Sequence, residues 1–590
     1  MPKIEVNEEV FYALAGGNRW KTREEFEEAL TCAKAELDED ADRSLPPAER
    51  TLKIELNDTN RPDLWATAGC ARQLRIYHGG PLPEYPFFSR PGDSQKTSRK
   101  VVVEKTVKQV RPCLAGFVAS GKAVSDASLR DMIQTQEKLA WNFGRKRRTI
   151  SMGLYRIGII RWPIHYRAVD PDSVSFVPLQ WDTPLTLREI LKQHPKGKEY
   201  AFILEHEPLH PLLIDDGGAV LSYPPIINSA DLGAVQVGDR DLFVELTGAD
   251  EAAVTLAASI MACDLADQGF IIEPVEVEYE YETPFGAAAG KGNSVTTPFY
   301  FQEPVFCSLA RIEKFLGEKL GAAECLESLA RMGVRAERAA GAEDGAGAAA
   351  IRSRNPVDGI LAFPPEYRND FLHPADVAED VMIGRGLNSF KPERPGDFTV
   401  GRLTPLTVFS RRVKELLVGM GYQEMIYNYL GSRKDLVEKM RGDGKRIIRI
   451  SNPMTENYEY LRDSVLASLM ASESVSGHAV YPHRIFEIGK AAYIDGGENY
   501  GTRTRQFLGF IHTGTDAGFN TAAAQIQTLF YYLNRDYGVE EARDPRFIDG
   551  RAASIMYRGG TVGVFGELHP GLLEHWGAAL PGRAAEVVLD

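Results

Sequence analysis

The sequence predicts a multidomain α+β protein, and three observations lead to that class. The chain has 590 residues, so at roughly 150 residues per domain we expect about four domains. Its composition, 44% hydrophobic and 25% charged, is typical of globular proteins and excludes disorder or coiled coil as overall descriptions. Stretches with strand-like alternation and stretches with helical spacing both recur along the chain. We therefore expect several mixed cores.

The charge balance limits the kinds of partner. The chain carries 68 Lys+Arg and 82 Asp+Glu, a net charge of −14, whereas a protein that coats nucleic acid is normally basic. Any RNA contact must therefore come from a local patch or from a partner chain. The six cysteines form no C-x-x-C pair, which argues against a zinc ribbon and a disulfide framework. With acids at the start and no apolar run of ~18 residues, we expect a soluble, cytoplasmic protein.

An N-terminal α/β module is expected over residues 1–90. Lys3–Val6 and Thr51–Leu56 alternate like strands. Thr22 and Glu25 have the spacing of a capping box, and the apolar positions that follow at helical spacing predict one helix through Phe26, Leu30, Ala33 and Leu37. A polar segment between Ser89 and Lys100 is the expected domain boundary.

Two further domains are expected over residues 91–285 and 298–392. The first reads as mixed α/β, with a loop at Thr283–Thr297 leading to the second. Its expected strands are Val101–Val103, Phe202–Leu204 and Leu242–Val244, and its helices Asp126–Phe143 and Glu251–Gln268. The smaller domain is expected to hold helices at Ser308–Leu316 and Ala322–Met332, and a solvent-exposed Ala/Gly-rich excursion at 338–350.

The last domain is expected over residues 400–590. Thr404 and Pro405 are a cap and a first-turn proline, and the apolar positions from Leu406 to Met420 keep helical spacing until Gly421. Strands and helices then alternate to the end.

Two short motifs imitate catalytic sites without meeting their requirements. His206 and His210 match the H-E-x-x-H zinc pattern, but Pro208 between them breaks the helix that this chemistry needs. The glycine-rich segment from Gly286 to Gly292 is one residue too short for a phosphate loop, and Gly292 replaces the Mg²⁺-binding hydroxyl residue. We assign no function to either.

An acidic segment is more informative. Asp376, Glu379 and Asp380 share one face of the helix expected after Pro374, and Asp370 lies on the segment leading into it. Converging carboxylates require a neutralising cation, either Mg²⁺, which prefers oxygen ligands, or an arginine such as Arg368 or Arg385. Residue chemistry alone leaves both alternatives open. The basic run Arg145–Arg148 is similarly open between a phosphate contact and a solvated charge run.

Several segments, in order along the whole chain, carry a family resemblance. The chain resembles the β subunit of phenylalanyl-tRNA synthetase in its shorter, archaeal/eukaryotic-like form. The matching segments are Asn57–Trp65, Leu221–Ser229, Tyr367–Asp380, Arg484–Gly489 and Gly566–Pro570.

The resemblance implies an α2β2 enzyme that joins phenylalanine to its tRNA with ATP and Mg²⁺. Its β chain would supply an N-terminal module, an editing domain, a small metal-knuckle domain with Asp370, Asp376, Glu379 and Asp380 as ligands, and an antiparallel class II catalytic-like domain. The Arg-x-Glu that would clamp ATP and the amino acid is missing after Gly489, where Lys490 to Asp495 follow. The aminoacylation site is therefore expected on the α chain.

The resemblance also implies an editing pocket for tyrosine, whose positions fall on Leu213, Ser222, Glu245 and Thr247. An apolar pocket rejects a substrate with one added hydroxyl only by roughly 10²-fold, so a second, hydrolytic site improves fidelity. An ordinary buried polar cluster is the alternative. Two whole-chain alternatives are a freestanding editing hydrolase and a non-catalytic RNA-binding scaffold. The class II-like domain favours the subunit, because a hydrolase would not need it.

Overall fold

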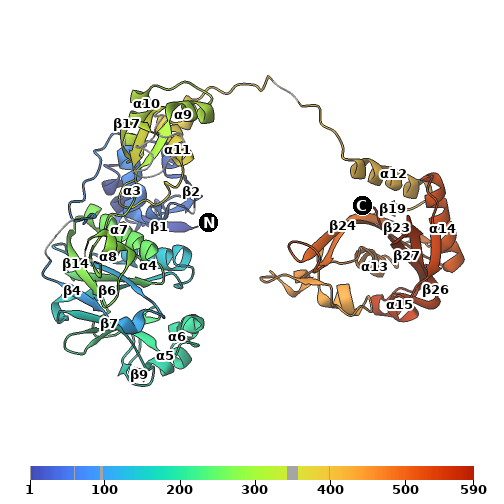
Figure 1. The fold of residues 1–590 in the computed structure, drawn as a ribbon, viewed down its shortest axis with the longest axis horizontal. Coiled ribbons are helices and arrows are strands. Elements are labelled where there is room, and N and C mark those ends of the chain that lie inside the picture. Colours follow the sequence, from blue (N-terminus) through green and yellow to red (C-terminus); the bar gives the residue numbers. More distant parts are fainter. Residues whose placement is uncertain (1, 59, 93–96, 291, 342–356, 397–398) are drawn as a thin grey trace. The chain divides into compact units, whose positions relative to one another are not determined.

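The computed structural model describes residues 2–58, 60–92, 97–290, 292–341, 357–396 and 399–590 (Figure 1). The chain forms two compact units, Met1–Glu393 and Arg394–Asp590. Part of the expected Ala/Gly-rich excursion, 342–350, lies outside the described residues. Its first part was assigned wrongly, because Arg338 to Gly341 belong to a strand.

The first unit opens with a three-stranded antiparallel sheet, in the order β1 (Lys3–Asn7), β3 (Thr51–Leu56), β2 (Ala35–Glu39). Helices α1 (Glu8–Leu14), α2 (Arg23–Leu30) and α3 (Thr67–Tyr77) accompany it. The predicted helix through Leu37 is wrong in its second half. A 3₁₀ turn, Thr31–Ala33, and Lys34 at φ 52° end the helical path, and Leu37 lies on β2 between exposed neighbours.

A ten-stranded sheet forms the middle of this unit. Nine of its strands follow the order β12-β11-β10-β7-β4-β14-β5-β13-β6, and the tenth, β15, pairs with β14 outside this order. Its strands are β4 (Lys100–Val103), β5 (Cys113–Ser120), β6 (Ile150–Arg156), β7 (Ile164–Val169), β10 (His210–Asp215), β11 (Val220–Tyr223), β12 (Ile227–Asn228), β13 (Leu242–Gly248), β14 (Ile271–Tyr279) and β15 (Ser294–Thr297). A separate pair is β8 (Ser175–Phe176) with β9 (Leu185–Thr186). The helices are α4 (Asp126–Lys138), continued by a π-helical turn Leu139–Phe143, α5 (Leu187–Gln193), α6 (Pro195–Tyr200), α7 (Glu251–Asp267) and α8 (Pro284–Ala288).

Helix α7 packs on β5 and β13 and is buried over most of its length, because a run of small and apolar residues covers nearly its whole circumference. Two expectations fail in this region. The apolar segment at Phe202 forms a 3₁₀ turn, Ala201–Ile203, and the expected loop at Thr283–Thr297 contains α8 and β15. His206 lies in a turn and His210 begins β10, so the two histidines do not share a helix.

The last part of the first unit is a small sheet, in the order β16 (Val305–Ser308), β18 (Val357–Phe363), β17 (Arg335–Gly341), with α9 (Leu309–Leu316), α10 (Ala322–Arg331) and α11 (Pro374–Arg385) beside it (Figure 1). Buried Arg72 of α3 joins this part to the others. Its Nη1 lies 2.8 Å from Asp267 of α7, and its guanidinium lies 3.9 Å from the ring centre of Tyr367. Such a desolvated cation held by a carboxylate and an aromatic face favours a fixed arrangement.

The second unit is built on a seven-stranded sheet, in the order β19 (Gln423–Glu424), β23 (His483–Ile494), β24 (Thr502–Thr513), β28 (Gly582–Val588), β27 (Gly560–Leu568), β26 (Phe547–Tyr557), β25 (Gly538–Glu541). Only β19–β23 pairs in parallel among the described strands of this sheet. A second sheet joins β20 (Leu430–Gly431), β22 (Tyr460–Leu461) and β21 (Ile448–Arg449). The helices are α12 (Pro405–Gly419), α13 (Leu466–Val475), α14 (Phe519–Tyr532) and α15 (Pro570–Trp576).

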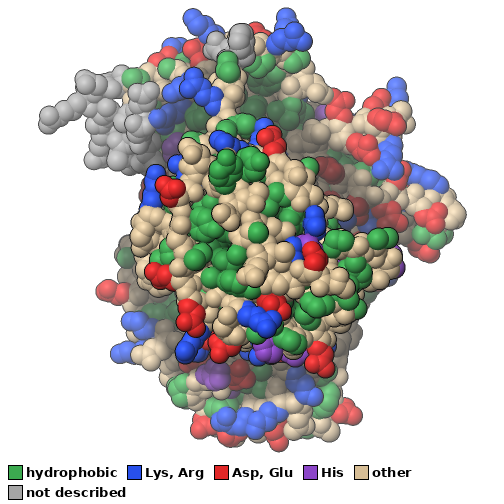
Figure 2. Space-filling model, turned by 90° about the vertical axis from the view of Figure 1, so that its right-hand side faces the viewer, with side chains coloured by type: hydrophobic (Ala, Val, Ile, Leu, Met, Phe, Trp, Pro, Cys, Tyr) green, Lys and Arg blue, Asp and Glu red, His purple; other side chains and the backbone are tan. Residues whose placement is uncertain are grey.

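Helices α12 and α14 of this unit contact each other and leave apolar side chains exposed. Figure 2 shows hydrophobic side chains among the polar ones on the surface that faces the viewer. Val408 and Val418 of α12 are 54% and 56% exposed, and Tyr531 and Tyr532 of α14 are 75% and 57% exposed. None of the described helices is long and apolar enough to cross a membrane.

Candidate functional site

Strand order places the predicted pocket residues near the two ends of the ten-stranded sheet, with Glu245 and Thr247 on β13, next to the edge strand β6, and Ser222 on β11, next to the edge strand β12. Glu245 on β13 lies between Gly116 of β5 and Gly153 of β6, with only 1% of its surface exposed. Ser222 of β11 is paired with Leu213 of β10. Because both residues paired with Glu245 are glycines, no side chain lies directly opposite it on either neighbouring strand. Its carboxylate therefore has room to contact side chains from other positions of the sheet.

The group it meets is the hydroxyl of Tyr155. The Tyr155 oxygen lies 2.7 Å from Oε2 of Glu245 and 2.8 Å from Oγ of Ser222. Gly153 makes this contact possible, because a Cβ there would lie 2.1 Å from the Tyr155 hydroxyl oxygen. Tyr155 therefore joins two of the predicted pocket residues, which are on different strands, in one hydrogen-bonded cluster.

The second carboxylate oxygen of Glu245 is available to a ligand. Oε1 is buried and has no hydrogen-bond partner among the described residues. Burial raises the pKa of Glu245 to about 7, although the Tyr155 hydroxyl, the Arg111 guanidinium and the nearby Thr247 hydroxyl oppose the shift. Glu245 and Ser222 line a cavity of about 350 Å³ together with Tyr155 and apolar side chains that include Met132. This is the size and character of a small-molecule pocket with few polar groups.

Thr247 belongs to a neighbouring network. Its side chain is fully buried and accepts a hydrogen bond from Nε of Arg111 at 3.1 Å. The same guanidinium donates to Oγ of Ser151 at 3.1 Å and to the Thr247 carbonyl oxygen at 2.6 Å. Arg111 is also buried, which lowers its pKa, and the Tyr166 hydroxyl holds its carbonyl at 3.0 Å. Thr247 is thus fixed behind the pocket, and it does not line the cavity.

The structure therefore brings Ser222 and Glu245 together at the cavity, and places Leu213 and Thr247 behind it as packing and hydrogen-bonded neighbours. Tyr155, Gly153 and Arg111 were not among the pocket residues predicted from the sequence. A glycine two residues before a tyrosine on a strand-like segment was the available signal for the first two, because both lie on the same face of a strand.

The acidic segment before α11 is organised around an arginine. Arg368, 1% exposed, places Nη2 2.6 Å from Asp370 and Nη1 2.6 Å from Asp380. Although burial opposes it, this guanidinium lowers the pKa of Asp370 to about 2. The other two carboxylates have different partners. Asp376 accepts the backbone N–H groups of Leu372 and His373, and Glu379 lies 2.9 Å from Nζ of Lys34.

These four carboxylates do not fit a shared metal site as they are placed, because each is matched by a protein donor. No group of three or more His, Cys, Asp or Glu within the described part of the chain is arranged to hold a metal ion. The Mg²⁺ hypothesis for Asp370, Asp376, Glu379 and Asp380 stays a prediction.

Comparison with known proteins defines the class. Residues 393–589 match the model described as the phenylalanyl tRNA synthetase beta chain CLM domain, and residues 305–387 match the tRNA synthetase B5 domain. The chain is thus an aminoacyl-tRNA synthetase subunit.

Full-length relatives define the family. The chain is 44% identical to "Phenylalanine--tRNA ligase beta subunit" of Treponema pallidum subsp. pallidum, covering 100% of this chain and 99% of that relative, and 44% identical to the protein of the same name from Borreliella burgdorferi, with the same coverage. A solved N-terminal fragment of the phenylalanyl-tRNA synthetase β-subunit from Pyrococcus horikoshii is 33% identical, with a TM-score of 0.55, and covers 65% of this chain and 100% of the fragment. The chain belongs to the family of phenylalanine–tRNA ligase β subunits.

Proposed function

We propose that this chain assembles with an α subunit into an α2β2 enzyme that attaches phenylalanine to its tRNA with ATP and Mg²⁺, in the cytoplasm. The exposed apolar side chains of α12 and α14 supply a surface suited to a permanent partner. The predicted division of the chain at 1–90, 91–285, 298–392 and 400–590 belongs to this proposal. So does the archaeal/eukaryotic-like form of the subunit.

The second unit supports placing the aminoacylation site on the α subunit. Glu487 of β23 is 3% exposed, and its two oxygens lie 2.7 and 2.9 Å from Nη2 and Nη1 of buried Arg462. A Cβ at Gly489 would lie 2.2 Å from that guanidinium, so the strand is closed over the pair. An acid already neutralised inside the core is not available to bind ATP or an amino acid.

We also propose that the 350 Å³ cavity is the site at which the ester bond of wrongly formed tyrosyl-tRNA is hydrolysed. The observation that carries this proposal is the buried, unpartnered Oε1 of Glu245 beside the Tyr155 hydroxyl. A tyrosine side chain would donate its hydroxyl to Oε1, whereas phenylalanine would leave that oxygen unpaired at a cost of about 1–3 kcal/mol. Such a polar site selects for the hydroxyl, in the opposite sense to an apolar synthetic pocket.

The chain's own residues would bind and orient the ester. Glu245 and Ser222 hold the polar end of the tyrosyl group, and the apolar lining excludes water from its ring. Near neutral pH, Glu245 exchanges between an ionised and a neutral form. The ionised carboxylate accepts a hydrogen bond from the tyrosine hydroxyl.

One experiment tests the division of labour between the chains. The purified chain alone should show no phenylalanine-dependent ATP–pyrophosphate exchange, and exchange should appear when the α subunit is added. Robust exchange by the isolated chain would overturn the placement of the active site.

A second experiment tests the cavity with preformed tyrosyl-tRNA and the reconstituted enzyme. Glu245→Ala removes a buried hydrogen bond worth roughly 1.5–3 kcal/mol, so hydrolysis should fall by about one to two decades while phenylalanine charging stays nearly intact. Glu278→Ala, on a surface position of the same sheet, is the matched control and should leave both rates unchanged. Equal hydrolysis by wild type and Glu245→Ala would place tyrosine recognition elsewhere.

A further inference from the structure

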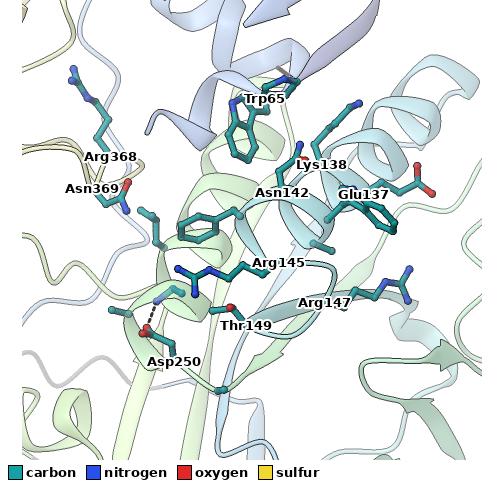
Figure 3. Close-up of a pocket in the computed structure, with 18 of the residues that line it drawn as sticks. Trp65, Glu137, Lys138, Asn142, Arg145, Arg147, Thr149, Asp250, Arg368 and Asn369 are labelled. Carbon is teal, nitrogen blue, oxygen red and sulfur yellow. Dashed lines mark hydrogen bonds between the residues drawn. The ribbon is translucent and has the colours of Figure 1, made fainter. Parts of the chain in front are cut away.

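A second, larger cavity lies in the first unit beside the editing cavity. It has a volume of about 1650 Å³, above the ~300–1,000 Å³ typical of small-molecule sites, so it suits a segment of a polymer (Figure 3). Its lining comes from all three sheet-containing parts of the unit, with Trp65 from the first, Trp141 and Arg145 from the second and Asn369 from the third.

Two buried polar atoms at this lining lack partners. Nε1 of Trp65, a residue only 2% exposed, and Oδ1 of Asn369 have no hydrogen-bond partner among the described residues. A buried donor and a buried acceptor left unpaired are unusual in a folded protein, and they indicate a ligand with polar edges.

The basic turn, Arg145–Arg148, borders this cavity in a strained conformation. Arg145, Lys146 and Arg147 have φ values of 50°, 56° and 65°, three successive left-handed residues that are not glycine. Each costs roughly 1–2 kcal/mol, and such strain persists where the surroundings enforce it. Here the buried Arg111 guanidinium donates to the carbonyl oxygens of Arg147 and Arg148 at 3.2 and 3.1 Å.

Two side chains of this turn have different environments, since Arg147 is hydrogen-bonded to the protein and Arg145 is exposed. Arg147 is anchored, donating to the carbonyl oxygens of Pro225 and Ile226 at 3.0 Å. Arg145 is exposed, and its guanidinium makes no hydrogen bond or ion pair with any described residue. In Figure 3 its side chain points toward the middle of the lining residues. Trp141, 45% exposed, lines the same cavity, with Nζ of Lys146 5.1 Å from its ring centre. Positive groups beside an accessible aromatic ring are the elements that bind single-stranded nucleic acid.

The two cavities are adjacent. Glu137, Arg147 and Lys196 line both of them. A molecule whose end occupies the editing cavity would therefore continue past these residues into the larger one.

We propose that the larger cavity binds the single-stranded 3′ end of the tRNA while its aminoacyl group is in the editing cavity, an inference that rests on the proposed editing function. Arg145 contacts a phosphate, and Trp141 stacks on a base. Two acids of the lining are already occupied, Glu199 by Lys196 at 3.0 Å and Asp250 by the N–H of Ala253. With a net charge of −14 there is little long-range attraction for RNA, so binding depends on these local contacts.

The test compares two ester substrates with the reconstituted α2β2 enzyme. Trp141→Ala and Arg145→Gln should each raise the KM for tyrosyl-tRNA hydrolysis about tenfold and leave hydrolysis of 3′-O-tyrosyl-adenosine, which has no neighbouring nucleotides, unchanged. Arg145→Lys keeps the charge and should recover most of the loss. Arg130→Ala, an exposed arginine of α4, is the matched control and should behave as wild type.

A binding measurement keeps this inference separate from editing. A fluorescein-labelled single-stranded RNA ending in CCA should bind the enzyme more weakly after either Trp141→Ala or Arg145→Gln, and the salt dependence should fall only with Arg145→Gln. Unchanged RNA binding overturns the proposal, as does an equal loss with tyrosyl-adenosine or a loss of α-subunit association alone. If wild type hydrolyses neither ester but these variants still weaken RNA binding, the editing function fails and the RNA site stands.

Discussion

The hydroxyl oxygen of Tyr155 lies 2.7 Å from Oε2 of Glu245, and both groups are buried inside the ten-stranded sheet. The residues lie on adjacent strands, β6 and β13, and the glycine opposite Glu245 leaves the space in which they meet. This pair leaves the other carboxylate oxygen of Glu245 without a partner among the described residues, and under the proposed editing function that oxygen would distinguish tyrosine from phenylalanine.

Replacing Tyr155 by phenylalanine should impair editing more than folding. The change leaves Oε2 of Glu245 without its donor and removes a hydrogen bond that lowers the pKa of this carboxyl. We expect a stability loss of about 1–3 kcal/mol and at least a tenfold fall in tyrosyl-tRNA hydrolysis. Tyr166→Phe is the matched control, because among the described residues that buried hydroxyl bonds only the Arg111 carbonyl, so its loss should affect stability alone. A similar loss of editing in both variants would contradict a specific role for Tyr155.

Adding one methyl group at Gly153 should displace the same pair. The new Cβ would lie 2.1 Å from the Tyr155 hydroxyl oxygen and 2.6 Å from Oε2 of Glu245, so the cluster must shift. Overpacking of this kind costs about 1–3 kcal/mol, and we expect Gly153→Ala to reduce tyrosyl-tRNA hydrolysis with phenylalanine charging retained. Gly158→Ala, where a Cβ meets nothing within 4 Å, serves as control. Wild-type editing by Gly153→Ala would show that the Tyr155 contact is dispensable.

The raised pKa of Glu245 predicts a specific pH dependence of stability. Its pKa is near 4.5 when unfolded and about 7 when folded, so between these values the unfolded state loses the proton that the folded state keeps. Stability contributed by this group is thus fully present below pH ~4.5, declines as pH rises to ~7, and stays lower above, by about 3 kcal/mol at most.

Glu245→Gln removes this titration and isolates its effect from other carboxylates. In urea unfolding at pH 5 and pH 8, the variant should gain stability relative to wild type at the higher pH. A difference between variant and wild type that does not change with pH would mean that Glu245 titrates normally.

Local patterns predicted much of the fold. Helices α7 and α12 lie close to their predicted bounds, and α11 begins at Pro374 as predicted, because these signals lie within or next to the helix itself. Predictions failed at Leu37 and Phe202, where short apolar runs are compatible with both helix and strand and the surrounding contacts decide.

The site was less accessible to sequence reasoning. Glu245 was found through its family position, but its partner Tyr155 reaches it from another strand, 90 positions away in sequence, and the charge of Arg111 acts on it from a segment 134 positions away. No local pattern encodes such a sheet register. Arg368 was different, since it lies two residues before Asp370 and was considered as one of two ways to neutralise the acidic segment.

That arginine gives a stability prediction. Removing one partner from a buried charge cluster leaves the others uncompensated, so Arg368→Met should destabilise the first unit by about 3–5 kcal/mol in urea unfolding. Arg338→Met removes an exposed arginine that pairs with Asp358 in the same small domain, and should change stability little. Equal effects of the two substitutions would show that Arg368 does not balance Asp370 and Asp380.

Unfolding experiments on the same acidic segment distinguish Arg368 from Mg²⁺ as the cation that neutralises its carboxylates. If Arg368 neutralises Asp370 and Asp380 as the geometry indicates, removal of divalent ions with EDTA should leave the unfolding curve of the wild-type chain unchanged. Asp376→Ala should still cost about 0.5–2 kcal/mol, because its carboxylate accepts two N–H groups at the start of α11. Asp376→Asn keeps an acceptor there and should retain most of that stability. Stoichiometric Mg²⁺ in the purified protein, lost in an Asp376→Asn/Glu379→Gln double variant, would instead establish these carboxylates as metal ligands.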